Sequence, residues 1–93
     1  MITTFACRET EKIFEGQRSR KLPSEIQQRA RRRLMQLHNA QNINDMRIPP
    51  SNHLEKLSGN LAGFWSVRVT QQWRLVFLWE DGSAAEARMI DYH

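Results

Sequence analysis

Cysteine is almost absent from this sequence, and long apolar runs are absent altogether. Cys7 is the single cysteine, so the chain cannot form an internal disulfide, and no CxxC or paired Cys/His spacing suggests a structural zinc. No apolar stretch approaches the ~20 residues that a membrane-spanning helix needs. The first eight residues lack the basic and apolar regions of a secretory signal, so we expect a cytoplasmic protein that does not bind membranes. Cohesion must therefore come from side-chain packing.

The composition indicates one small globular domain covering residues 1–93. Of the 93 residues, 40% are hydrophobic and 26% are charged, a balance that excludes a disordered chain. A chain of this length buries roughly 60–70% of the surface that its unfolded form exposes. That is enough for one sheet backed by one or two helices, and too little for a second core.

Positive charge exceeds negative charge, and the excess lies in one segment. The chain has 14 Lys and Arg residues against 10 Asp and Glu residues, which gives a formal charge of +4. Residues 18–33 contain a single acid, Glu25, and a block of basic residues: Arg18, Arg20, Lys21, Arg29, Arg31, Arg32 and Arg33. This basic segment favours contact with a polyanion such as nucleic acid, held through its phosphates. The alternative is a solvated helix face without a partner.

The first forty residues predict one strand followed by two helices. Residues 2–7 are β-branched and aromatic without glycine or proline, which is typical of a strand. A short helix is expected from Thr10 to about residue 15, with Gly16 ending it. Residues 22–39 predict a longer helix. Its apolar stripe consists of Ile26, Ala30, Leu34 and Leu37.

A long connector and three strands are predicted after these helices. Residues 39–60 are rich in Asn, Ser and Pro, include His53 and Lys56, and are typical of an ordered functional loop. Alternating apolar and polar side chains then predict strands over residues 64–69, 73–79 and 84–91. Asp81-Gly82 is expected to form the last turn. The expected fold class is therefore α+β, with an antiparallel-dominated sheet and the element order β-α-α-β-β-β.

The alternation places two arginines side by side on one face of the sheet. Apolar residues of the first two of these strands must face the same core, which requires Val69 to lie opposite Trp73. Arg68 then lies directly opposite Arg74. Adjacent like charges destabilise a sheet, and an anion bound between them would explain why both are present. The alternative is an exposed face on which salt screens the repulsion.

The last three residues have two possible registers. A two-residue loop at Asp81-Gly82 puts Asp91 and His93 on the arginine face, whereas one more loop residue puts Tyr92 there instead. The sequence does not decide between them.

The polar residues near the two arginines are those that metal-free cleavage of RNA requires. Attack of a 2′-hydroxyl on the adjacent phosphodiester needs a general base, a general acid for the leaving 5′-oxygen and fixed cations for the developing charge. Arg68 and Arg74 would supply the cations, without any cofactor or metal. Proton transfer would fall to the histidines and the carboxylate, His53, Asp91 and His93. Tyr92 would stack on a base or take part in proton transfer. Each residue alone also has an ordinary structural explanation, so the hypothesis depends on their occurring together.

Five sequence elements occur in an order that resembles one family. They are residues 48–50 (IPP), 54–59 (LEKLSG), 63–69 (GFWSVRV), 73–77 (WRLVF) and 91–93 (DYH). Together they resemble the HigB toxins of the RelE superfamily, and the similarity extends over nearly the whole chain. The resemblance implies a small sheet with two N-terminal helices packed on one face.

The resemblance also implies an activity and partners. Members of that family are bacterial type II toxins that cut messenger RNA in the ribosomal A site and are inhibited by a helix-turn-helix antitoxin. The expected partners are thus a HigA-like antitoxin, the ribosome and mRNA. The family's active-site residues correspond here to His53, Arg68, Arg74, Asp91, Tyr92 and His93. The basic segment and Lys56 would contact ribosomal RNA.

A non-catalytic function is the alternative to this hypothesis. A basic nucleic-acid-binding or regulatory module would use the same arginines to bind RNA or DNA and leave it intact. The chain shows no helix-turn-helix pattern, so operator DNA would be bound only indirectly, through the antitoxin.

Overall fold

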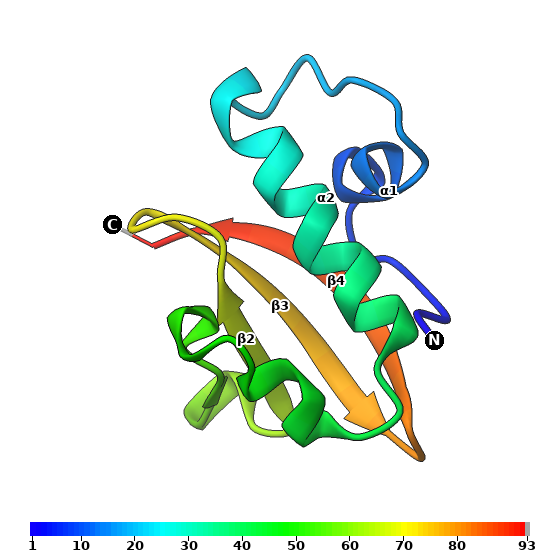
Figure 1. The fold of residues 1–93 in the computed structure, drawn as a ribbon, viewed down its shortest axis with the longest axis vertical. Helices are drawn as coiled ribbons and strands as arrows, with labels where there is room; N and C mark the ends of the chain where they lie inside the picture. The colour runs from blue at the N-terminus through cyan, green and yellow to red at the C-terminus, as the bar shows by residue number, and fades with distance from the viewer. Residues whose placement is uncertain (93) are drawn as a thin grey trace.

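The computed structural model describes residues 1–92, in which two α-helices accompany a four-stranded antiparallel sheet (Figure 1). The helices are α1 (Arg8–Phe14) and α2 (Ser24–Asn39). The strands, in their order across the sheet, are β1 (Glu55–Lys56), β2 (Phe64–Arg68), β3 (Trp73–Glu80) and β4 (Ser83–Asp91). Three short 3₁₀ helices lie in the connector: η1 (Ile43–Arg47), η2 (Pro50–Asn52) and η3 (Gly59–Leu61). The predicted α+β fold is confirmed, while His93, a predicted site residue, lies outside the described residues.

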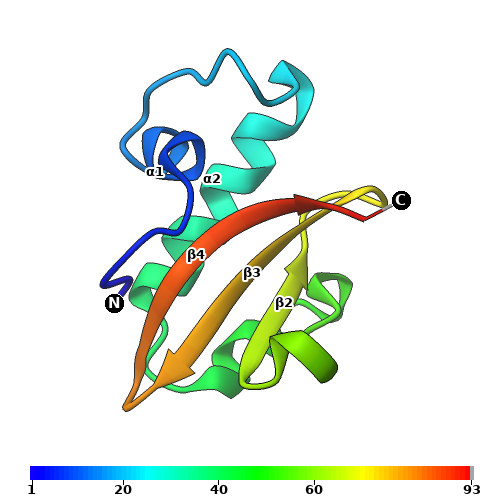
Figure 2. The same cartoon turned by 180° about the vertical axis from the view of Figure 1, so that it is seen from behind.

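The predicted apolar stripe of α2 packs against one face of the sheet. Its four residues are buried: Ile26, Ala30, Leu34 and Leu37. They share one core with Val67 of β2 and with Leu75 and Phe77 of β3. Figure 1 shows α2 in front of β3 and β4, and Figure 2 shows the same strands in front of α2. Removing these side chains from water supplies the main stabilisation of a chain that has no disulfide.

The predicted first strand does not form. Residues 2–7 make two isolated parallel bridges to β4, Ile2 to Ala84 and Phe5 to Ala87. Between these bridges the backbone N–H of Glu86 donates to the Thr4 hydroxyl (2.9 Å), so a side chain interrupts the ladder. The connector supplies a short strand that was not predicted, β1, and the observed order is α-α-β-β-β-β.

The hairpin of β2 and β3 has the predicted register. Arg68 pairs with Arg74, and Val67 pairs with Leu75 on the core face. The pairing follows from side-chain alternation, because a shift by one residue would have exposed the whole apolar set. One face of this hairpin therefore packs on α2, and the opposite face carries the two arginines.

A bulge in β4 resolves the register that the sequence leaves open. Glu80 pairs with Ser83 around the two-residue Asp81-Gly82 turn, but the pairing shifts by one residue between Val76 and Leu78 of β3. Glu86 has a left-handed backbone conformation (φ 53°), as an extra residue in a bulged strand can have. The loop is therefore short, and the extra residue lies in the strand. As a consequence Ile90, and with it Tyr92, lies on the Arg74 face.

Buried Ser19 organises the loop between the two helices. Its hydroxyl donates to a carboxylate oxygen of Glu9 (2.7 Å) and accepts from the backbone N–H groups of Lys21 and Leu22. Gln27 of α2 accepts from the Ser19 N–H and donates to the Ser19 carbonyl. The hydrogen bond from Ser19 is the main cause that lowers the pKa of Glu9, with a smaller contribution from Lys12.

Ser19→Ala is expected to weaken the pH dependence of stability. Because the pKa of Glu9 is lower in the folded chain than in the unfolded one, its ionised form stabilises the fold above the unfolded pKa. That contribution is lost as the pH falls through the folded pKa. Urea unfolding at about pH 7 and pH 3 should therefore show a smaller stability difference for Ser19→Ala than for wild type. Ser24→Ala, which removes an exposed hydroxyl, is the control, and an equal difference in all three proteins would contradict the assignment.

Candidate functional site

Arg74 is a buried cation held by hydrogen bonds. It lies on β3 and is only 9% exposed. Its Nε donates to the hydroxyl of Ser66 on β2 (2.9 Å), and its Nη2 donates to the backbone carbonyl of His53. Glu55 of β1 lies at the limit of an ion pair, 4.0 Å from Nη2. These contacts fix the guanidinium in one orientation, which is the condition for an electrostatic site that needs no rearrangement.

Arg68 lies beside Arg74, and no described residue neutralises its charge. It is half-buried at the end of β2 and forms no ion pair with any residue from 1 to 92. The cross-strand pair therefore places two cations side by side on a face that also carries Arg88 of β4 and the carboxylate of Glu55. Such an arrangement favours an anion, and a guanidinium fork matches the geometry of a phosphate.

Tyr92 joins the arginine face and Asp91 does not. The guanidinium carbon of Arg74 lies 5.8 Å from the centre of the Tyr92 ring, within the range of a cation–π contact. Asp91 instead pairs with Trp73, whose side chain packs on the core, and its carboxylate accepts from the Gln72 amide (3.1 Å). The bulge in β4 causes this separation.

His53 contacts Arg74 through its backbone, while its side chain is exposed. The residue follows η2 in a left-handed conformation (φ 45°, ψ 58°), and this turn directs its carbonyl toward Nη2 of Arg74. The preceding residue, Asn52, is fully buried and donates to the Met46 carbonyl (3.1 Å) and to the side chain of Gln36 on α2 (3.0 Å). The connector is therefore anchored in the core through Asn52, and it holds Arg74 through the carbonyl of His53.

Lys56 lies on the other face of the sheet from Arg74. It pairs with Trp65, and its Nζ lies 5.7 Å from the centre of the indole ring. The structure therefore groups Arg68, Arg74, Tyr92 and the carbonyl of His53, and leaves Lys56 and Asp91 outside this group.

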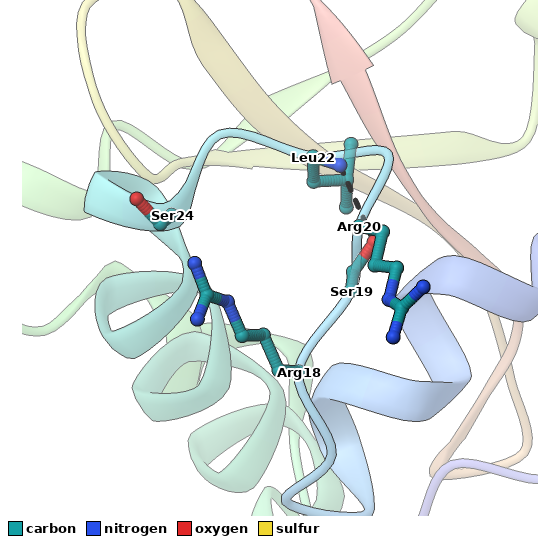
Figure 3. A pocket seen from close by; sticks show the side chains of 5 residues that line it. All are labelled: Arg18, Ser19, Arg20, Leu22 and Ser24. Atoms are coloured by element: carbon teal, nitrogen blue, oxygen red, sulfur yellow. Dashed lines mark hydrogen bonds between the residues drawn. The ribbon is translucent and has the colours of Figure 1, made fainter.

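The basic segment is divided between two surfaces. Arg18 and Arg20 line a pocket of about 610 Å³ beside the loop between the helices, where Figure 3 shows their side chains extending to opposite sides of the chain. Arg18 also lines a second depression with Arg31, and Lys21 is exposed in the same loop. The other three, Arg29, Arg32 and Arg33, line a groove of about 320 Å³ together with Arg68. Part of the segment is thus continuous with the candidate site.

Two site residues were missed in the sequence. Ser66 lies two positions before Arg68 on β2, so alternation alone would have placed its hydroxyl on the arginine face. Glu55 lies in β1, a two-residue strand that carries no pattern of its own. The signal for Ser66 was present, and that for Glu55 was not.

The described part of the chain holds neither a candidate metal cluster nor a candidate membrane span. Residues 1–92 contain no group of three or more His, Cys, Asp or Glu side chains placed to hold a metal ion. Within the same residues, no helix has the length and apolar character needed to cross a membrane.

Comparison with known proteins first defines the class of fold. The structure matches a variant of YafQ from E. coli with a TM-score of 0.68, at 15% identity over 98% of this chain and 91% of that one. It matches a chain of the heterotetrameric YoeB–YefM toxin–antitoxin complex from Staphylococcus aureus with a TM-score of 0.63, at 22% identity over 100% of this chain and 95% of that one. The fold is therefore that of the RelE-like toxins.

Sequence similarity then identifies the family. The family model of HigB-like toxins, RelE-like toxins of type II toxin–antitoxin systems, matches residues 3–93. Toxin HigB-1 of Vibrio cholerae serotype O1 is 47% identical over 75 residues, which cover 80% of this chain and 79% of that protein. The chain belongs to the HigB-like toxin family.

Proposed function

We propose that this type II toxin is a ribosome-dependent endoribonuclease that cuts messenger RNA in the ribosomal A site. The observation that supports this activity best is the cross-strand pair of Arg68 and Arg74, with the ring of Tyr92 over the second arginine. A scissile phosphate held between the two guanidinium groups would gain two charge-assisted contacts as negative charge develops on its oxygens.

Each group near the phosphate has a distinct role in this proposal. Nε and Nη2 of Arg74 are engaged by Ser66 and His53, so Nη1 is the nitrogen left to bind a phosphate oxygen. Tyr92 would stack on a base of the message or pass a proton. His93 would transfer a proton between the 2′-hydroxyl and the leaving 5′-oxygen, because an imidazole can both accept and donate a proton. His53 would assist through its exposed side chain. Asp91 lies on the opposite face of the sheet, where it would help to hold the end of β4 in position.

The proposed partners follow from the family. A HigA-like antitoxin with a helix-turn-helix domain would inhibit the toxin, as a toxin–antitoxin pair requires, and would account for any binding to operator DNA. The ribosome would present the message, with ribosomal RNA contacting the exposed basic residues. The YoeB–YefM complexes show that a toxin of this fold can assemble with an antitoxin.

Loss of cleavage in the variant His93→Gln tests the chemistry. Purified protein is added to a cell-free translation reaction, with and without ribosomes, and message integrity is followed by primer extension. Wild type is expected to cut within codons only when ribosomes are present. His93→Gln is expected to cut at least about 100-fold more slowly, since glutamine cannot transfer a proton.

Two outcomes would contradict the proposal. Cleavage by His93→Gln at the wild-type rate would remove the proposed proton transfer. Intact message in every reaction, with the protein still bound to RNA, would favour the non-catalytic binding module, in which Arg68 and Arg74 anchor phosphates without catalysis.

A further inference from the structure

A groove beside the candidate site is lined by arginines, and none of the described residues in its wall is acidic. Arg29, Arg32 and Arg33 come from α2, and Arg68 comes from the end of β2. The remaining lining residues are Ser51, Val69, Thr70 and Gln71. None of these four arginines forms an ion pair with a described residue. The groove thus concentrates positive charge that the fold itself does not neutralise.

Arg33 is fixed in position at the centre of this charge. Its Nε donates to the backbone carbonyl of Arg68 (3.1 Å), at the open edge of β2 beyond the short β1 strand. Burial is the main cause that lowers the pKa of Arg33, and repulsion from Arg32 and Arg29 adds to it. Crowding like charges around a half-buried guanidinium destabilises the free protein, and a bound anion would offset that cost.

We infer that this groove binds the sugar–phosphate backbone of the RNA strand, next to the phosphate held by Arg68 and Arg74. The inference depends on the proposed function, because it assigns the neighbouring part of the same substrate. Arg68 belongs to both surfaces, because it lines the groove and pairs with Arg74 across the strands. The hydroxyls of Ser51 and Thr70 add hydrogen-bonding groups suited to phosphate and ribose oxygens.

The chemistry of the wall favours RNA over an acidic protein segment. Among the described residues of the wall, Val69 alone is aliphatic, and it is buried in the core. Protein interfaces depend on buried aromatic or aliphatic anchors, which this wall does not offer. Exposed arginine forks at spaced positions suit the regular charges of a nucleic-acid backbone.

The test compares two double variants that lose the same charge. Arg29→Ala/Arg32→Ala removes two exposed arginines of the groove and leaves Arg33 in place, so the fold should be retained. Arg8→Ala/Arg47→Ala removes two exposed arginines that lie outside both the basic segment and the groove. The probe is a fluorescent single-stranded RNA of about ten nucleotides with 2′-O-methyl riboses, which cannot undergo cleavage by 2′-hydroxyl attack. Binding is measured by fluorescence anisotropy between about 50 and 200 mM salt.

The groove variant is expected to bind about tenfold or more weakly, with a salt slope smaller by about 1.4, because two phosphate contacts are lost on a single strand. The control variant is expected to change affinity by less than about threefold. Equal losses in the two variants would overturn the inference, because net charge alone would then explain binding. It would also be overturned by an absence of wild-type binding at low salt, or by a groove variant that loses only its co-sedimentation with ribosomes.

The outcome is separable from that of the proposed nuclease activity. A probe that cannot be cut measures the groove even if the message survives in every translation reaction. Conversely, the groove variant could cleave message on the ribosome and bind the probe as well as wild type does. That result would support the nuclease activity and reject the role of the groove in RNA binding.

Discussion

Arg74→Ala is expected to lower the rate of message cleavage by about 10²–10³-fold or more. The substitution removes a fixed cation from the position where negative charge develops in the transition state. It also leaves the hydroxyl of Ser66 and the carbonyl of His53 without their donor, so the neighbouring cation, Arg68, loses its organised surroundings. The rate is measured under single-turnover conditions with ribosome-bound message.

Two further variants separate chemistry from folding. Arg74→Lys keeps the positive charge but cannot reproduce the guanidinium fork. This variant should fold, and its cleavage rate should be at least about tenfold below that of wild type. Arg47→Ala removes an exposed arginine of η1 whose Nε donates to Asn44, and it should cleave at the wild-type rate. Full activity in Arg74→Ala would show that the cross-strand pair has no part in catalysis.

Phe77→Ala is expected to lower the free energy of unfolding by about 3–5 kcal/mol. The ring is fully buried in the core between the sheet and α2, and truncation leaves a cavity that rigid neighbours fill only partly. This loss is a large share of the roughly 5–15 kcal/mol that stabilises a typical domain. Urea denaturation, monitored by tryptophan fluorescence, measures this change in the free energy of unfolding.

The adjacent residue provides the control for this prediction. Leu78 precedes the end of the same strand, lies on the opposite face and is only partly buried. Leu78→Ala should therefore cost about half as much or less. Equal losses at the two positions would contradict the assignment of the core to one face of β3.

The central hairpin could be predicted because two independent constraints agree on it. Apolar residues alternate along both strands, and the short loop at Thr70 permits the one register that buries both sets. The pairing of Arg68 with Arg74 follows without further assumption. The stripe of α2 was predictable for the same reason, since its spacing matches the helical repeat.

Other features depend on contacts between segments that are distant in sequence. The first strand was expected from β propensity in residues 2–7, but propensity does not report that the bulge at Glu86 interrupts the partner strand. The strand β1 exists because β2 offers it an edge, with no pattern in its own two residues. Tertiary context decides both cases.

The candidate site was predictable in its cations and less so in its surroundings. Alternation located Arg68 and Arg74, whereas the contribution of His53 as a backbone acceptor depends on its left-handed conformation after η2. No local sequence pattern predicts a left-handed conformation at this histidine, since non-glycine residues adopt it only rarely. Likewise, the division of the basic segment between two surfaces reflects where α2 lies on the sheet, and charge counting does not show it.

The bulge at Glu86 makes the composition of the site depend on the pairing of β4 as well as on its residues. A strand of the same length without the bulge would continue the register of the Asp81-Gly82 turn to its end, which would place Met89 opposite Arg74 and move Asp91 to the Arg74 face. A carboxylate would then replace an aromatic ring beside the cation, although every residue of the site is retained. Relatives that carry the same ending on an unbulged strand of this length can therefore present a different chemistry.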